Sequence, residues 1–142
     1  MAIIDIPGAY LHVHVGKNGK IIMLFKGRIA ELMDMIGPKL YHKYVTYDSK
    51  GNAMLYVQMS KALYGLLEGA LHFYNKLVKD LEEYGFEINP YGPCVANKTT
   101  NRKQMTVTWH VDDLKLSHKE PFQITKFASY LSSIYGVKLT VK

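Results

Sequence analysis

The sequence has little cysteine and no long apolar run. Its one cysteine, Cys94, has no second thiol to pair with, which excludes an intramolecular disulfide. The longest apolar stretches, such as residues 21–25, fall far short of the roughly 20 residues that a membrane span needs. No secretory leader is recognisable either. The sequence therefore predicts a chain without a disulfide framework and without a membrane partner.

Long runs of one charge are also missing. Eighteen Lys and Arg outnumber twelve Asp and Glu, and the net charge of +6 favours a polyanionic partner such as nucleic acid. The basic residues are scattered along the chain, so an ordinary solvated surface explains them equally well. A length of 142 residues, of which 48% are apolar, suits one core and hardly two, which predicts a single globular unit.

The hydrophobic periodicity predicts a mixed α+β fold. Apolar residues recur at intervals of three and four in three stretches, and these predict helices at 27–36, between Gly65 and Gly85, and at 120–135. Alternating or β-branched stretches predict strands, the first of them interrupted or ended by Pro7-Gly8. The predicted strands are 2–14, 44–48, 53–59, 94–97, 104–110, 114–117 and 138–142.

Acidic residues stand where two of these predicted strands end. Asp5 lies near the end of the first strand, and Asp112-Asp113 interrupt the alternation between 104–110 and 114–117. Two carboxylates at a hairpin tip can converge on one point, whereas neighbours in a straight strand face opposite sides of the sheet. Acidic turns are common, so this pattern by itself has little specificity.

Four motifs in a fixed order give the chain a family resemblance. Residues 5–11 (DIPGAYL) resemble the first aspartate motif of copia-type retrotransposon reverse transcriptases, and 110–114 (HVDDL) resemble their catalytic hairpin. Between them, 57–66 (VQMSKALYGL) resemble the KALYGL element of the family, and 89–95 resemble its link into the hairpin. The resemblance implies a polymerase palm, an antiparallel sheet with helices packed on one face, as one partial domain over 1–142 of a Pol polyprotein.

The resemblance also implies a metal site. Asp5 and Asp112 would bridge two Mg²⁺ or Mn²⁺ ions, and Asp113 would complete the acidic cluster. Hard carboxylate oxygens suit these cations, and two such ions stabilise the attacking and leaving oxygens of nucleotidyl transfer. The implied activity is RNA- or DNA-templated DNA synthesis, with a template–primer and dNTP as substrates.

Three further residues would contact the nucleotide. Tyr10 stands where the family places an aromatic ring beneath the incoming sugar, although core packing explains a tyrosine there nearly as well. Tyr64 and Gly65 would lie near the nascent base pair, where a glycine lets the backbone approach a ligand closely. A glycine at a helix entry is the alternative explanation.

The chain departs from the family pattern at three points. His110 stands where tyrosine is usual, and 67–72 (LEGALH) replace a pattern of basic, Gln, small, Pro and Arg residues, which removes cationic contacts to template or primer. The fingers, the thumb, the ribonuclease H domain and the integrase of the family are missing. We therefore expect a fragment that has little activity alone and whose partner is the rest of the polyprotein. The resemblance allows a cytoplasmic particle or the nucleus as its location.

Other functions stay open. One is a catalytically inactive retroelement remnant that at most binds nucleic acid, and a weaker one is a metal-dependent phosphodiesterase that uses the same carboxylates. His12 and His14 on one face of an extended strand offer two imidazoles to zinc, with His110 or Cys94 to complete the site. Their spacing differs from that of structural zinc sites, and surface histidines are the commoner explanation.

Overall fold

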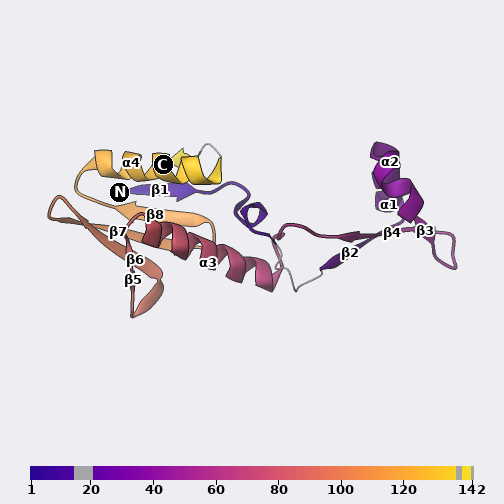
Figure 1. Cartoon of the computed structure of the whole chain (residues 1–142), viewed down its shortest axis with the longest axis horizontal. Coiled ribbons are helices and arrows are strands. Elements are labelled where there is room, and N and C mark those ends of the chain that lie inside the picture. Colours follow the sequence, from indigo (N-terminus) through magenta and orange to yellow (C-terminus); the bar gives the residue numbers. More distant parts are fainter. Residues whose placement is uncertain (15–20, 137–138, 142) are drawn as a thin grey trace. The chain divides into compact units, whose positions relative to one another are not determined.

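The computed structural model describes residues 1–14, 21–136 and 139–141, and the chain divides into two compact units (Figure 1). Unit 1 comprises Met1–His14 and Lys61–Lys142, and unit 2 is Val15–Ser60. Each unit has its own hydrophobic cluster, so the prediction of one core was wrong. The strands of unit 2 pair only with one another, which lets this short segment bury a small cluster of its own. The interpretation of 1–142 as one partial palm domain stays a prediction.

A six-stranded antiparallel sheet forms the base of unit 1, in the order β5-β6-β7-β8-β1-β9. Strand β1, the first of the chain, lies between β8 and β9, which come more than a hundred residues later. Figure 1 shows β1 beside β8. The strands are β1 (Ala2–Asp5), β5 (Glu87–Asn89), β6 (Gly92–Thr100), β7 (Lys103–His110), β8 (Asp113–Ser117) and β9 (Thr140–Val141).

Two long helices, α3 (Leu67–Glu83) and α4 (Pro121–Tyr135), pack on one face of this sheet. Alternation along β1 and β8 turns Ile4, Leu114 and Leu116 into that face, where each is fully buried. The helices cover these side chains with residues that are themselves buried, among them Phe73, Leu77, Leu81, Phe127 and Leu131. The opposite face of β1 and β8 carries the exposed and half-buried residues.

The predicted helices are confirmed, and the apolar stripe that helical spacing predicts for α3, at Leu67, Leu71, Tyr74, Val78 and Leu81, is buried in part. The sequence pattern placed Leu71 on the apolar stripe, whereas it is 58% exposed. Leu81 is buried together with Phe73 and Leu77 of the adjacent stripe, and Tyr74 and Val78 pack partly buried against the same core. Helix α4 begins at Pro121 and ends before Gly136, whose left-handed φ of 64° suits a glycine at a helix end.

The predicted first strand, 2–14, is shorter than expected. Only Ala2–Asp5 is a strand, because the chain turns at Pro7-Gly8 and continues as a 3-10 helix, η1 (Ala9–His12). At the other end, Thr140–Val141 pairs with β1 as the predicted terminal strand. Of the rest of that prediction, Leu139 is not part of the strand, and residues 138 and 142 lie outside the described residues.

Unit 2 is a three-stranded antiparallel sheet in the order β2-β4-β3 with short helices. The predicted hairpin is present as β3 and β4, and the carboxylate of Asp48 orders its loop by accepting hydrogen bonds from the backbone N–H groups of Lys50 and Asn52, both at 2.9 Å. Strand β2 and helix α2 had not been predicted. The elements are β2 (Ile22–Lys26), α1 (Arg28–Ile36), α2 (Pro38–Tyr41), η2 (His42–Tyr44), β3 (Thr46–Tyr47) and β4 (Ala53–Gln58).

The fold class is therefore α+β, as predicted. Within the described residues the chain forms four α-helices and two antiparallel sheets. In the same part of the chain, no helix is both long enough and apolar enough to cross a membrane.

Candidate active site at the hairpin tip

Asp5 and Asp113 face each other across neighbouring strands. They are Cα partners in the antiparallel pair β1–β8, and the backbone N–H of Ile6 donates to the carbonyl oxygen of Asp112 at 3.3 Å. Directly opposed residues of an antiparallel pair project to the same face of the sheet. The two acidic segments that the sequence singled out therefore lie side by side.

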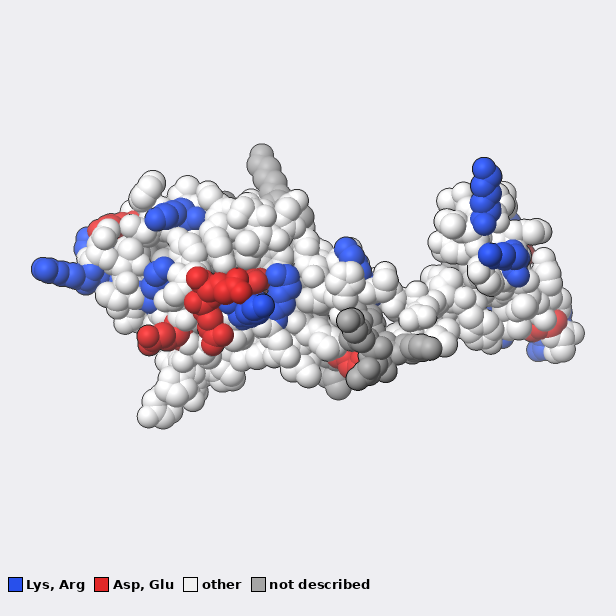
Figure 2. All heavy atoms as spheres, in the orientation of Figure 1, with Lys and Arg blue, Asp and Glu red and all other residues white. Residues whose placement is uncertain are grey.

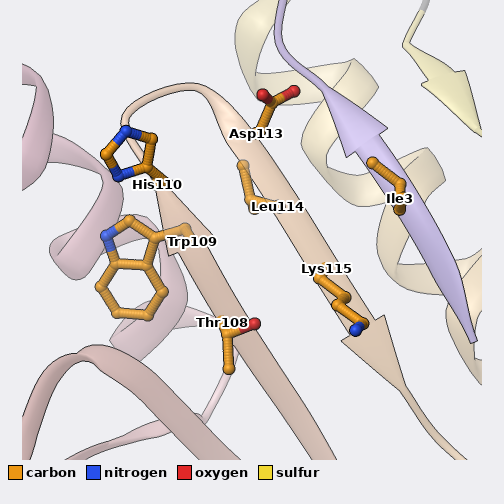
Figure 3. A pocket seen from close by; sticks show the side chains of 7 residues that line it. All are labelled: Ile3, Thr108, Trp109, His110, Asp113, Leu114 and Lys115. Atoms are coloured by element: carbon orange, nitrogen blue, oxygen red, sulfur yellow. The ribbon is translucent and has the colours of Figure 1, made fainter.

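The row extends to a third strand. His110 on β7 is the Cα partner of Asp113, so His110, Asp113 and Asp5 stand on one face across β7, β8 and β1. The next row on this face is Thr108, Lys115 and Ile3. Apart from Asp5, the residues of these rows line an open hollow on the sheet, in which Figure 3 shows Asp113 and His110 near the tip and Lys115 and Ile3 farther along the strands. Carboxylate, imidazole and ammonium groups thus share a surface that neither long helix covers.

The tip itself is a two-residue loop with an unusual backbone. Val111 and Asp112 connect the paired residues His110 and Asp113, and Val111 has a φ of +56°. A positive φ at the first loop residue and not at the second is the pattern of a type II′ turn, where glycine is the usual residue. A β-branched residue in this region is strained, at a cost of about 1–2 kcal/mol. The hairpin therefore holds Asp112 in a tight turn at the expense of backbone strain.

Tyr64 reaches the carboxylate of Asp112 from the loop that precedes α3. Its hydroxyl donates a hydrogen bond to Oδ2 of Asp112 at 2.7 Å. Its ring packs edge-on against the ring of Tyr10, with a centroid separation of 4.3 Å. Partial burial, and next the bond to Asp112, raise the pKa of Tyr64 to about 12, so the hydroxyl keeps its proton and acts as the donor at neutral pH. Tyr64 and Asp112 are thus directly coupled.

Gly65 allows this approach through its backbone conformation. The N–H of Leu66 donates to the carbonyl oxygen of Leu63 at 3.3 Å, which makes Leu63, Tyr64, Gly65 and Leu66 a β-turn. Gly65 occupies its third position with a φ of +92°, as a type II turn requires. A Cβ on Gly65 would meet nothing within 4 Å, so conformation rather than space favours glycine here. Its predicted proximity to a base pair stays a prediction.

Tyr10 is part of the wall behind the tip. It lies in η1, is 6% exposed, and contacts Phe73 at a centroid distance of 6.1 Å in addition to Tyr64. A cleft of about 240 Å³ opens there. Its lining residues are Tyr10, Ala70, Phe73, Tyr74, Cys94, Trp109, His110 and Val111. Tyr10 thus packs in the core and also borders a cleft beside the tip, and its predicted place beneath the sugar stays a prediction.

Acidic and basic side chains adjoin on the face of unit 1 seen in Figure 2, over α3. Helix α3 carries the ion pairs Lys76–Asp80 at 2.9 Å and Lys79–Glu83 at 3.8 Å. Opposite charges this close cancel much of each other's field. This face is therefore not a continuous basic track for nucleic acid.

The donors of a metal site are present in kind but are not assembled as a ligand cluster. Within residues 1–14, 21–136 and 139–141, no group of three or more His, Cys, Asp and Glu is placed to hold a metal ion. Asp5 and Asp113 are opposed, and one oxygen of Asp112 is bonded to Tyr64. Carboxylate oxygens are the atom type that Mg²⁺ prefers, so the donors fit this cation by their chemistry, and one of these oxygens already accepts the hydrogen bond from Tyr64.

The alternative of a zinc site at His12 and His14 required both residues to lie on one extended strand, and they do not. His12 lies in η1 rather than on a strand, where its Nε2 atom is 3.2 Å from the carbonyl oxygen of Pro7 and its ring packs edge-on against Tyr135. His14 is exposed and forms an isolated bridge with Lys61. The two imidazoles therefore do not share one face of an extended strand.

Sequence reasoning missed several features of this site. The bond between Tyr64 and Asp112 joins residues 48 positions apart, and no local pattern predicts it. The strain at Val111 had a signal, because a two-residue hairpin loop normally contains glycine, asparagine or aspartate at its first position. Trp109 was predicted in a strand, but its place beside the cleft depends on α3.

Comparisons with known proteins add no assignment. No model of a known protein family matches the chain, and no curated protein matches it.

Proposed function

We propose that this chain is the palm segment of a copia-type reverse transcriptase, with Asp5, Asp112 and Asp113 as its catalytic carboxylates. The observation that carries the proposal is the pairing of Asp5 with Asp113 across β1 and β8, since it brings the two acidic motifs together from opposite ends of the chain. An antiparallel sheet with both long helices on one face is the arrangement that the resemblance implies for a palm. The opposite face of the sheet, which the two long helices do not cover, would bind the substrate.

The residues divide the work of nucleotidyl transfer between them. Asp5, Asp112 and Asp113 would hold two Mg²⁺ or Mn²⁺ ions, which supply charge stabilisation for the attacking and leaving oxygens. Tyr10, packed against Phe73, would form a fixed wall beneath the sugar of the dNTP. Tyr64 would adjoin both the nucleotide and Asp112. The template–primer would lie on the open face that carries Lys115 and Thr108.

A second candidate, an inactive remnant that at most binds nucleic acid, has observations of its own. The carboxylates do not form a ligand cluster within the described residues. Leu71 stands 58% exposed where the family pattern has an arginine, so a phosphate contact from this position is lost. A metal-dependent phosphodiesterase would use the same three carboxylates. No feature of the described site favours that activity over the polymerase.

A chimera tests the proposed function. The segment replaces its counterpart in a complete copia-type polymerase, and primer extension is measured with Mg²⁺ and with Mn²⁺. We expect extension by the chimera and a loss of at least about 100-fold with Asp112→Asn, because the substitution removes a charged ligand at the reacting centre. A matched control is Asp48→Asn, which changes an acidic residue of unit 2. Equal inactivity of the chimera and its Asp112→Asn variant would favour the remnant.

Metal binding tests the site without activity. The three carboxylates carry like charges and repel one another, so Mg²⁺ or Mn²⁺ should stabilise the folded chain in proportion to its binding. We expect the melting temperature of the isolated chain to rise with either cation and the rise to disappear with Asp112→Asn. A melting temperature that stays the same with and without the cations would count against an intact site.

A further inference from the structure

We infer that Tyr64 is a latch on the proposed metal site: its hydroxyl holds the Asp112 carboxylate when no cation is bound and must release it for the cation to bind. The inference rests on the proposed function, because it concerns how the same three carboxylates are regulated. Besides the nucleotide contact proposed above, it gives Tyr64 a role as a positioning residue that acts through Asp112.

The contact is short and specific. The hydroxyl of Tyr64 lies 2.7 Å from Oδ2 of Asp112, which is the length of a strong hydrogen bond to a charged acceptor. Among the described side chains, Tyr64 is the one recorded hydrogen-bond donor to this carboxylate, and no ion pair involves it. The orientation of Asp112 in its strained loop is therefore set by a neutral phenol.

A cation and this phenol compete for the same region. A Mg²⁺ ion binds carboxylate oxygens at about 2.0–2.1 Å and demands near-octahedral ligand directions. A hydroxyl group donating along one lone-pair direction of Oδ2 occupies part of the space that such a ligand sphere needs. The free energy needed to break this hydrogen bond therefore subtracts from the free energy of cation binding. The site opens only when the cation binds more strongly than the hydroxyl does.

The structure also provides a way for the latch to open. Tyr64 is 54% exposed, so more than half of its surface already faces solvent in the closed position. It occupies the second position of the turn at Leu63 to Leu66, next to Gly65 with its φ of +92°. The edge-on contact with Tyr10 returns the ring to the closed position, because Tyr10 is buried and fixed against Phe73. Closed and open states therefore differ mainly in one side chain.

Mn²⁺ binding to the intact chain tests the latch, with bound ion counted by the loss of the free-ion electron paramagnetic resonance signal. Replacing Tyr64 by phenylalanine keeps the ring against Tyr10 and removes the hydroxyl. We expect the Tyr64→Phe variant to bind Mn²⁺ about 2- to 10-fold more tightly than the native chain, the worth of one net hydrogen bond. The control is Tyr74→Phe, which removes a hydroxyl that donates to the carbonyl oxygen of Pro93 at 2.9 Å, and it should leave the affinity unchanged.

The outcomes separate the two proposals. Tighter binding by Tyr64→Phe, abolished when Asp112→Asn is added, supports the latch. Equal or weaker binding by Tyr64→Phe overturns the latch and leaves the metal site standing. Absence of Mn²⁺ binding in the native chain and in Tyr64→Phe overturns the metal site, and the latch fails with it.

A second readout follows the hydroxyl directly. With 3-fluorotyrosine at position 64, the fluorine resonance should shift when Asp112→Asn is introduced without metal, because the charged acceptor is lost. Saturating Mg²⁺ should move the resonance of the native chain in a concentration-dependent way, since the ring leaves Asp112. A fluorine resonance that does not shift on Asp112→Asn would contradict the hydrogen bond itself, independently of the measured Mn²⁺ affinities.

Discussion

Unit 1 and unit 2 each cover one face of an antiparallel sheet with helices, but they bury very different amounts of apolar surface. In unit 1 one cluster runs from β1 through α3 to α4 and includes large side chains such as Phe73 and Phe127. In unit 2 the buried cluster of described residues is Ala30, Ala53 and Leu55. Burial of apolar area is the main stabilising term of folding. Unit 1 therefore gains more stabilisation from apolar burial than unit 2 does.

The exposed face of the unit 2 sheet strengthens the contrast. Leu24 and Tyr56 are Cα partners, so they share a face, and they are 41% and 57% exposed. Every predicted site residue, by contrast, belongs to unit 1. Charge differs as well, since unit 2 has seven Lys and Arg against three Asp and Glu. The difference teaches that the proposed chemistry is placed where the backbone is best supported by packing.

The largest expected effect comes from deleting core volume in each unit. Leu77 and Leu55 are both fully buried. We expect Leu77→Ala to lower the free energy of unfolding by about 3–5 kcal/mol and Leu55→Ala by about 2 kcal/mol, since a small cluster collapses more easily around a cavity. Trp109, the one tryptophan, reports on unit 1 in urea titrations. If Leu55→Ala shifts the Trp109 transition as much as Leu77→Ala does, the two units unfold together.

A smaller effect is expected from the buried carboxylate that joins α3 to α4. Asp80 is 7% exposed, and its Oδ2 atom accepts from the hydroxyl of Tyr135 at 2.7 Å and from Nζ of Lys76 at 2.9 Å. Burial, and next the bond to Asp80, raise the pKa of Tyr135. We expect Asp80→Asn to lower the free energy of unfolding, followed by Trp109 fluorescence, by about 1–3 kcal/mol. The substitution removes the buried negative charge that accepts the hydrogen bonds of Tyr135 and Lys76.

The exposed pair on the same helix is the matched control for Asp80. Lys79 and Glu83 lie 3.8 Å apart on the surface, and Glu83→Gln should change the free energy of unfolding by less than about 0.5 kcal/mol. A double-mutant cycle of Asp80→Asn with Tyr135→Phe should show coupling above about 0.5 kcal/mol. Additive losses would mean that Asp80 and Tyr135 act independently.

Relieving the backbone strain at the hairpin tip should raise the free energy of unfolding. Val111→Gly places the residue that a type II′ turn prefers where φ is +56°. The removed strain exceeds the added chain entropy of glycine, and we expect a stabilisation of about 0.5–1 kcal/mol, seen as a higher urea midpoint of Trp109 fluorescence. Val107→Gly, in the buried middle of β7, is the opposing control and should be clearly destabilising. A lower midpoint for Val111→Gly would show that the valine side chain contributes more than its backbone costs.

The smallest expected effect is a local dependence on pH in unit 2. Hydrogen bonds from the side chain and then the backbone of Asn52 hold the pKa of Asp48 below its ordinary value of 3.8. The folded loop favours the carboxylate, so its contribution is complete above that value and is lost as the pH falls through the lower folded pKa. The amide resonances of Lys50 and Asn52 should therefore titrate with a midpoint below 3.8. Asp48→Asn should remove this titration, and a midpoint at or above 3.8 would contradict the loop geometry.

Local patterns predicted the pieces of the fold better than their arrangement. The ends of α4 followed from Pro121 and Gly136, and the tip followed from the acidic interruption between two alternating stretches. The buried side of α3 followed only in part, because two adjacent stripes have helical spacing and only the sheet selects between them. Strand β2 was missed because a short apolar run has no distinctive period until β4 pairs with it.

The sequence by itself determined the three longer helices, the hairpin of β3 and β4 and the acidic residues at the tip, since each depends on side chains close together along the chain. Only the tertiary structure decided that β1 lies between β8 and β9, that Asp5 therefore faces Asp113, and that Tyr64 binds Asp112. These contacts join distant segments, and they form because the whole apolar face of the sheet is buried at once. No local preference of the backbone encodes that requirement.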